Sequence, residues 1–123
     1  MLNREQILGA VDVKTEDVDV PEWGGTVRIA VMSGVARDAL QASVVDNKSP
    51  SRFEAALVAA TAVDESGALL FSADDVATLQ AKNATVLTRV AAVAMALNNI
   101  GKKAAEEAVK NSEAAQSGDS GTA

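Results

Sequence analysis

The sequence lacks three residue types altogether: histidine, cysteine and tyrosine. Without histidine, the chain has no copy of the side chain that most often serves as a general base near neutral pH. Without cysteine, it has no disulfides, no thiol chemistry and no ordinary zinc site. The absence of cysteine also fits a reducing compartment such as the cytoplasm. The chain therefore carries little of the equipment of common catalytic sites.

Aromatic residues are also scarce, at 2% of the chain, although 48% of the residues are hydrophobic. Much of that hydrophobic content is alanine and valine, so the core has to be built mainly from small aliphatic side chains. A chain of 123 residues is expected to form one small domain of modest stability.

The excess of acidic residues limits the classes of partner. A net charge of −6 repels phosphate backbones, so we expect no nucleic-acid binding. No apolar run reaches the roughly 18 residues that a membrane-spanning helix requires. The first residues, MLNREQILGAV, carry charges where a signal peptide needs its apolar stretch. We therefore expect a soluble intracellular protein without a membrane segment.

The first third of the chain predicts a short helix followed by a β-hairpin. Asn3 is a suitable N-cap for a helix over residues 4–9, whose apolar side would carry Leu2, Ile7 and Leu8. Period-two alternation on both sides of PEWGG, residues 21–25, is typical of two strands joined by a turn. An isolated hairpin is marginal in water, so one face has to pack on the rest of the protein. The candidates for that face are Val18, Val20, Val27, Ile29 and Val31.

The remainder of the chain predicts further helices. Capping residues and helical spacing place them at about residues 34–46, 50–62, 73–80 and 84–100. In the first of these, the predicted apolar stripe is Val35, Ala39, Leu40 and Val44. Between the second and third, a turn and a short apolar run form either a second, very short hairpin or an extended corner.

These elements predict an α+β fold, mostly helical, in which the N-terminal β-hairpin packs against a small bundle of about four to five helices. We expect a single domain over residues 1–110, whose last part, residues 102–110, is a weak polar helix. Residues 111–123 contain no apolar residue larger than alanine, so we expect a disordered C-terminal tail there.

Three pairs of carboxylates could in principle bind a metal or act as acid and base, and each pair also has a local structural role on a strand face, in a turn or at a helix start. The pairs are Asp17 with Asp19, Asp64 with Glu65, and Asp74 with Asp75. The chain has no phosphate-binding glycine loop, and the adjacency of Lys48 and Ser49 is no evidence for a catalytic dyad. We therefore expect no enzyme activity, no cofactor and no metal, with a small carboxylate or Ser–Lys enzyme as the rival hypothesis.

Larger apolar side chains at turns are the candidates for partner binding. They are Trp23, Met32, Leu69, Leu70 and Phe71. Trp23 has two interpretations, because it either packs onto the core or is held out as an anchor, and tryptophan is enriched at binding hot spots. A core of small aliphatics favours packing, in which case Trp23→Ala would cost roughly 3–5 kcal/mol.

The stretch VDVPEWGGTVRIAVMSGVARDAL resembles the start of the tail assembly chaperones of long-tailed bacteriophages and prophages. Four motifs follow the order found in that family, over about residues 1–100. They are REQIL at residues 4–8, PEWGG at 21–25 with Val27 and Arg28, Ser33-Gly34 with Arg37-Asp38, and a segment from Val63 to Leu79 containing VDE, Gly67, LFS and DDV. The last stretch, residues 101–123, matches no motif of the family.

The resemblance implies a non-enzymatic role in the cytoplasm of the host bacterium. Such chaperones bind the tape measure protein and keep it soluble while the tail tube assembles, and they are absent from the mature virion. A longer form, made by ribosomal frameshifting, recruits the tail tube protein. The alternative function is that of a structural minor tail protein of the virion. The chain either forms a homo-oligomer or acts as a single copy. The contact with the partner protein is either a helix in a groove or a strand added to a sheet edge.

Overall fold

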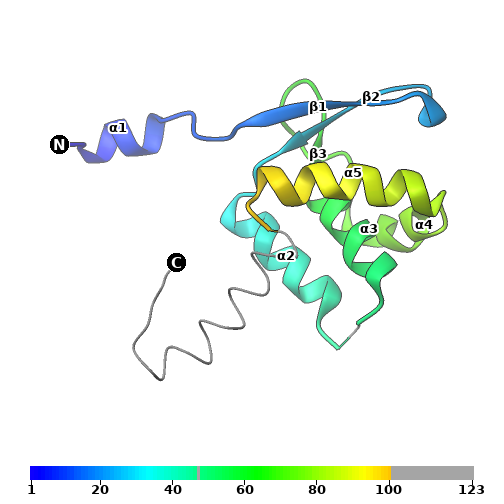
Figure 1. Ribbon diagram of the computed structural model, residues 1–123. Helices are drawn as coiled ribbons and strands as arrows, with labels where there is room; N and C mark the ends of the chain where they lie inside the picture. The colour runs from blue at the N-terminus through cyan, green and yellow to red at the C-terminus, as the bar shows by residue number, and fades with distance from the viewer. Residues whose placement is uncertain (47, 101–123) are drawn as a thin grey trace, which may run out of the picture.

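The computed structural model describes residues 1–46 and 48–100, so the predictions for residues 102–110 and 111–123 lie outside the described part of the chain. The predicted fold class is confirmed, because the structure is an α+β fold, mostly helical, with an N-terminal hairpin lying on the helices (Figure 1). In chain order the elements are α1 (Arg4–Gly9), β1 (Thr15–Val20), the 3₁₀ turn η1 (Pro21–Trp23), β2 (Gly25–Ala30), α2 (Gly34–Val44), α3 (Pro50–Thr61), β3 (Ala62–Val63), the 3₁₀ turn η2 (Ala73–Asp75), α4 (Val76–Gln80) and α5 (Ala84–Leu97).

The helices begin where short polar side chains satisfy their first free N–H groups. Asn3 and Gln6 form a reciprocal capping box at α1, with both bonds at 2.9 Å. The side chains of Ser33, Ser49 and Asn83 accept bonds from the first turns of α2, α3 and α5. Because these caps are local, the sequence places the starts of these four helices correctly.

The sheet is antiparallel, with the strand order β1-β2-β3. Of the hairpin residues predicted to face the core, Val18, Val20 and Ile29 are buried, whereas Val27 and Val31 are partly buried. The third strand was not predicted, because two residues carry no periodic signal. An isolated bridge pairs Val63 with Leu69, so the apolar run after the turn forms the second, very short hairpin rather than an extended corner.

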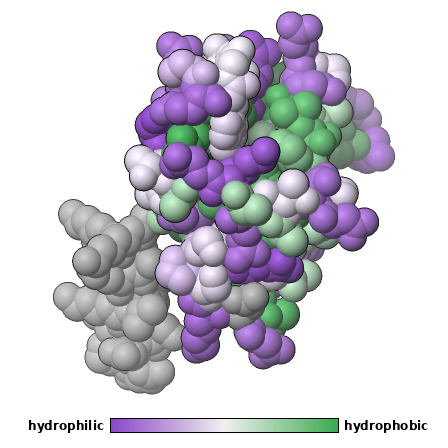
Figure 2. All heavy atoms as spheres, turned by 90° about the vertical axis from the view of Figure 1, so that its right-hand side faces the viewer, coloured by the Kyte–Doolittle hydropathy of each residue, from purple (hydrophilic) through white to green (hydrophobic). Residues whose placement is uncertain are grey.

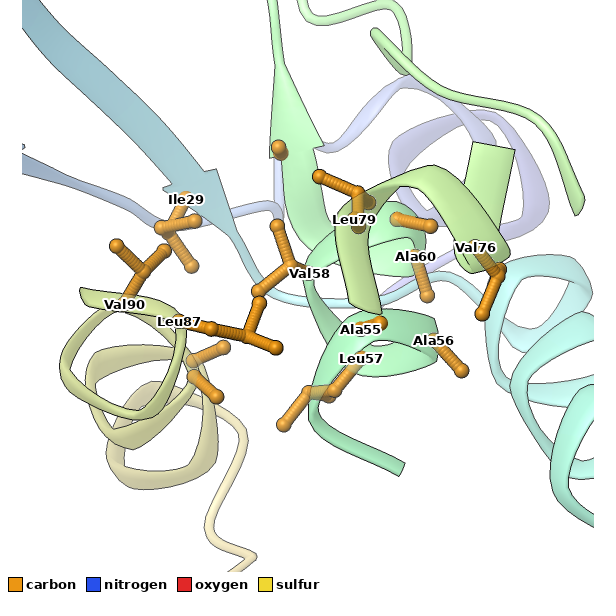
Figure 3. Close-up of a cluster of buried hydrophobic side chains, with 14 of the residues drawn as sticks. Ile29, Ala55, Ala56, Leu57, Val58, Ala60, Val76, Leu79, Leu87 and Val90 are labelled. Carbon is orange, nitrogen blue, oxygen red and sulfur yellow. The ribbon is translucent and has the colours of Figure 1, made fainter. Parts of the chain in front are cut away.

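Helix α3 lies at the centre of the core and contacts α2, α4, α5 and β2. All seven residues from Ala55 to Thr61 are buried, and four of them are alanines. A helix that is apolar on every side is typical of a fully enclosed position. Figure 3 shows side chains of α3 meeting those of β2, α4 and α5 from several directions.

The stripe predicted for α2 is wrong in two of its positions. Ala36 and Leu40 are buried against the core, whereas Val35 is 80% exposed and Ala39 is also exposed. The sequence pattern favoured the larger valine, but the face of the helix that meets α3 is centred one position further along the chain.

Helix α1 extends away from the rest of the molecule, as Figure 1 shows. None of its residues is buried, and Leu2, Ile7 and Leu8 on its predicted apolar side are each more than half exposed. Short helices in proteins draw most of their stability from packing of an apolar face. The apolar side of α1 therefore lacks a partner surface within the described residues.

Asn98 joins the end of α5 to the sheet. Its Oδ1 accepts from the N–H of Met32 at 2.7 Å, and its Nδ2 donates to the carbonyl oxygens of Ala30 at 3.3 Å and Ala94 at 2.9 Å. The side-chain amide thus forms hydrogen bonds with the main chain at Ala30 and Met32, as a neighbouring strand would. This contact fixes the position of α5 relative to the hairpin.

We predict that Asn98→Ala lowers the free energy of unfolding by about 1–3 kcal/mol, because it leaves partly buried main-chain groups unpaired. Urea denaturation followed by circular dichroism measures the change. Gln41→Ala, an exposed position on α2, is the matched control and should change stability little. Equal stability of the Asn98 and Gln41 variants would contradict the structural role of the amide.

Candidate protein-binding surface

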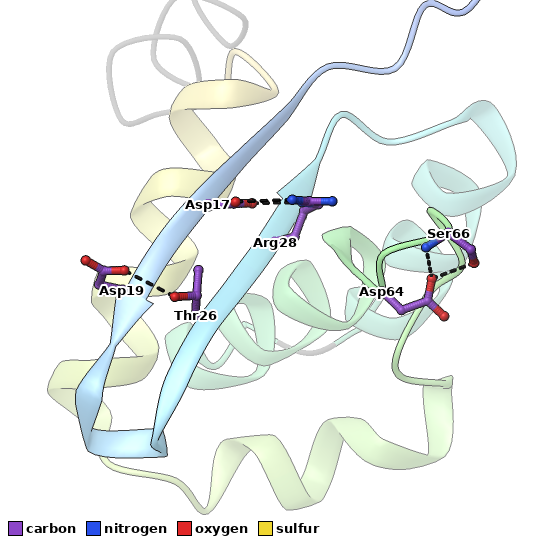
Figure 4. Close-up of polar contacts among 6 residues, drawn as sticks. All are labelled: Asp17, Asp19, Thr26, Arg28, Asp64 and Ser66. Carbon is purple, nitrogen blue, oxygen red and sulfur yellow. Dashed lines mark hydrogen bonds and ion pairs between the residues drawn. The ribbon is translucent and has the colours of Figure 1, made fainter.

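The centre of the candidate site is the loop that follows β3, and its shape is set by Asp64. One carboxylate oxygen of Asp64 accepts from the N–H and hydroxyl of Ser66, at 2.8 and 2.6 Å, and from the N–H of Ala68 at 3.1 Å (Figure 4). These bonds, led by the one from the Ser66 hydroxyl, lower the pKa of Asp64 below its ordinary value. Gly67 adopts a φ of +90°, which glycine reaches without strain. The turn therefore reverses the chain tightly and brings Leu69 beside Val63.

Large apolar side chains follow this turn directly. Leu69 and Leu70 are 49% and 50% exposed, and Phe71 is partly buried against the core. Figure 2, which looks at the end of the molecule where the hairpin tip and α4 lie, shows apolar side chains gathered at the upper right among hydrophilic ones. Apolar side chains grouped on a surface with a polar rim are typical of a binding site.

Three hollows surround this loop. The largest, about 700 Å³, lies between β2 and the Asp64 turn and is lined by Val27 and Leu70. The second, about 180 Å³, lies over α2 and α3 and is lined by Leu69 and Phe71. The third, about 160 Å³, has Phe71 and Trp23 in its wall. We call Trp23, Leu69, Leu70 and Phe71 the loop surface, because each of them lines at least one of these hollows.

Trp23 reaches the loop surface from the hairpin turn. Pro21 begins the 3₁₀ turn, and Gly24 ends it in a left-handed conformation with a φ of +87°. The indole is partly buried and packs against the core cluster, while it also lines the third hollow with Leu79. The two interpretations of Trp23 are therefore not exclusive, because the side chain packs against the core and also lines an open hollow.

An ion pair connects this turn to α5. Glu22 accepts from the guanidinium of Arg89 at 2.6 and 3.0 Å. The hydrogen bond from Arg89 is the main cause that lowers the pKa of Glu22 from 4.5 to about 2. The pair is solvent-exposed, so its contribution to stability is modest and depends on salt. It nevertheless connects residues that lie far apart in the sequence and orients the turn that carries Trp23.

Met32, the fifth candidate, lies apart from the loop surface. It is partly buried, packs against the core, and is bonded through its N–H to Asn98. The structure therefore brings four of the five candidate residues together and leaves Met32 elsewhere. It adds Val27, Val76 and Leu79 to the walls of the hollows, which sequence reasoning missed because spacing shows only which face of an element is apolar.

The carboxylate pairs occupy structural positions. Asp17 is paired with Arg28 at 2.8 Å, and the bond lowers the pKa of Asp17. Asp75 caps the start of η2 together with Ser72. Among residues 1–46 and 48–100, no group of three or more acidic side chains is arranged to hold a metal ion. None of the helices in this same part of the chain combines the length and apolar composition needed to cross a bilayer.

Comparison with known proteins gives a likeness among solved structures but none among family models or curated sequences. No model of a known protein family matches the chain, and no curated protein matches it. Among solved structures, the chain is similar to the tail assembly chaperone of bacteriophage HK97, with a TM-score of 0.57 and 24% sequence identity. The match covers 80% of this chain and 95% of the other. The protein therefore has a fold like that of a phage tail assembly chaperone.

We predict that Glu22→Gln lowers the melting temperature at pH 7. The difference in melting temperature between variant and wild type should disappear at acid pH. Because the folded pKa of Glu22 lies below 4.5, the ion pair contributes fully above about pH 4.5 and is lost as the pH falls toward 2. Thermal melts across this range provide the measurement. Asp38→Asn, at an exposed position on α2, is the control. A gap that stays constant with pH would refute the role assigned to the pair.

We also predict that Trp23→Ala lowers the free energy of unfolding by about 1.5–2.5 kcal/mol, roughly half the usual cost for a fully buried indole. The smaller value replaces the expectation from sequence, because the ring is only partly buried. Chemical denaturation of the variant measures it. A loss below about 0.5 kcal/mol, which is typical of surface substitutions, would show that the indole does not pack on the core.

Proposed function

We propose that this protein is a tail assembly chaperone of a long-tailed phage or prophage. The observation that carries the proposal is the fold shared with the HK97 tail assembly chaperone over most of both chains. The apolar loop surface supports it, because a chaperone of this kind acts through a contact surface rather than through a reaction site. The motifs from REQIL to the segment around Phe71 support the same assignment independently of the fold.

In this proposal the partner is the tape measure protein, which is kept soluble in the host bacterial cytoplasm while the tail tube assembles. The loop surface would shield apolar segments of that protein, and Asp64, Glu65, Asp74 and Asp75 lie next to it in the sequence as a charged surround. Buried apolar contacts supply affinity, whereas the charges favour solubility and discriminate between partners.

The tail tube protein would be recruited mainly by a frameshifted longer form. No enzyme activity is part of the role, and residues 1–110 form its single domain.

Co-expression with the tape measure protein of the same phage or prophage tests this function. We expect the wild type to raise the soluble fraction of the tape measure protein and to copurify with it. Leu69→Asp combined with Leu70→Asp should lower the affinity by about thirtyfold or more, since a hot-spot residue contributes at least about 2 kcal/mol. Both side chains are half exposed, so the fold should survive the change.

Val35→Asp is the control, because it introduces a charge of the same sign at an apolar position that is 80% exposed on α2. It should retain full activity, and circular dichroism should show all variants folded. If the wild type leaves the tape measure protein insoluble and no complex is recovered, the chaperone assignment fails. Recovery of the protein in purified virions would instead assign it as a structural minor tail protein.

A further inference from the structure

The outer edge of β1 is an open strand edge. The N–H of Val31 donates to the carbonyl of Lys14 at 2.9 Å, so these two opposing residues face each other across the hairpin. In an antiparallel ladder, such hydrogen-bonded pairs alternate with pairs whose main-chain groups point outward. The register then turns the N–H and C=O groups of Thr15, Asp17 and Asp19 away from β2.

Within residues 1–46 and 48–100, these outward main-chain groups make no hydrogen bond, and all three residues are exposed. The other side of the hairpin is covered from Arg28 to Ala30, since β3 pairs with Arg28 and Ile29, and the amide of Asn98 bonds to Ala30. A row of unpaired main-chain groups is a template for another strand. The hairpin is therefore paired along this part of β2 and able to accept a strand along β1.

The charges on β1 indicate what kind of strand fits. Asp17 is neutralised by Arg28, as Figure 4 shows, but Asp19 accepts only a hydroxyl bond from Thr26 at 3.2 Å, and Glu16 makes no ion pair within the described part of the chain. A second copy paired with β1 would bring its own Glu16 and Asp19 to this edge, and like charges brought together across two strands are destabilising. A segment carrying lysine or arginine is instead complementary.

The arm that precedes β1 extends this surface. Val11 and Val13 are 96% and 49% exposed, and Ile7 and Leu8 of α1 follow further out. A segment running antiparallel to β1 would pass Asp19 first and reach these apolar side chains last. The complementary segment therefore has basic residues followed by apolar ones.

We propose that β1 binds an extended, basic segment of a partner protein as a fourth strand of the sheet, with the apolar arm covering the end of that segment. Strand addition of this kind draws affinity from main-chain hydrogen bonds and specificity from alternate side chains. The proposal selects the strand edge over the helix-in-groove mode for this surface. It does not depend on a role in tail assembly, because any protein with such a segment would qualify.

The test uses the full chain and the synthetic peptide TKVKKTTVT, which sets lysines against the carboxylates of β1 and its last valine against Val13. We expect a Kd tighter than about 1 mM that weakens as salt is raised. In nuclear magnetic resonance spectra, the amides of Thr15, Asp17 and Asp19 should gain protection from hydrogen exchange. The peptide with glutamates in place of lysines should bind at least about tenfold more weakly.

Two matched pairs isolate the main-chain contacts. One peptide is N-methylated at its second, fourth and sixth residues, which oppose Asp19, Asp17 and Thr15. It keeps every side chain but should lose at least about tenfold in affinity, because its N–H groups can no longer bond to β1. Thr15→Pro removes one outward N–H at the first position of the strand, where proline is tolerated, whereas Thr15→Val keeps that N–H. We expect only the proline variant to weaken binding, with both variants folded by circular dichroism.

Three results would overturn the proposal. The first is equal binding of the N-methylated and unmodified peptides, and the second is a Kd weaker than about 1 mM. The third is protection of the β1 amides that appears on self-association without peptide, which would assign the edge to a second copy. Because the probe is a peptide, none of these outcomes bears on whether the protein solubilises a tape measure protein.

Discussion

The enclosure of α3 is the constraint on which the rest of the structure depends. Seven consecutive residues of this helix are buried, so α2, α4, α5 and the sheet must approach it from different sides. Four alanines among those residues allow the close approach. Among the described residues, Thr61 is the one buried polar side chain, and its hydroxyl donates to the carbonyl of Leu57 at 2.7 Å, so its hydrogen-bonding capacity is satisfied inside the core. The buried cluster around α3 consists of aliphatic side chains, in agreement with the low aromatic content of the sequence.

A core of this kind leaves the bulkier side chains at its perimeter. Trp23 and Phe71 pack against the core from outside, and Leu69 and Leu70 are half exposed beside them. The arm with α1 and the free edge of β1 lie at the start of the same sheet. The body is thus held together by small residues, while among residues 1–46 and 48–100 these larger apolar side chains lie at the surface and the edge of β1 is unpaired.

Much of the fold could be predicted because its signals are local. Helix starts followed from single capping residues such as Ser33 and Asn83, and the hairpin followed from alternation around PEWGG. The candidate site was predicted only in part, since Leu69 to Phe71 stood out as an apolar run after a turn. Met32 satisfied the same criterion of a large apolar side chain but lies apart from the loop surface, because its position depends on the contact with Asn98.

The sequence by itself determined which segments are helical or extended, because caps, turns and apolar periodicity act over a few neighbouring residues. Only the tertiary structure decided which faces meet. It buried Ala36 rather than Val35, created the two-residue strand β3, and left α1 and the edge of β1 without partners in the described part of the chain. These outcomes depend on the relative positions of elements far apart in the chain, as in the bond of Asn98 to Ala30, and no local pattern encodes them.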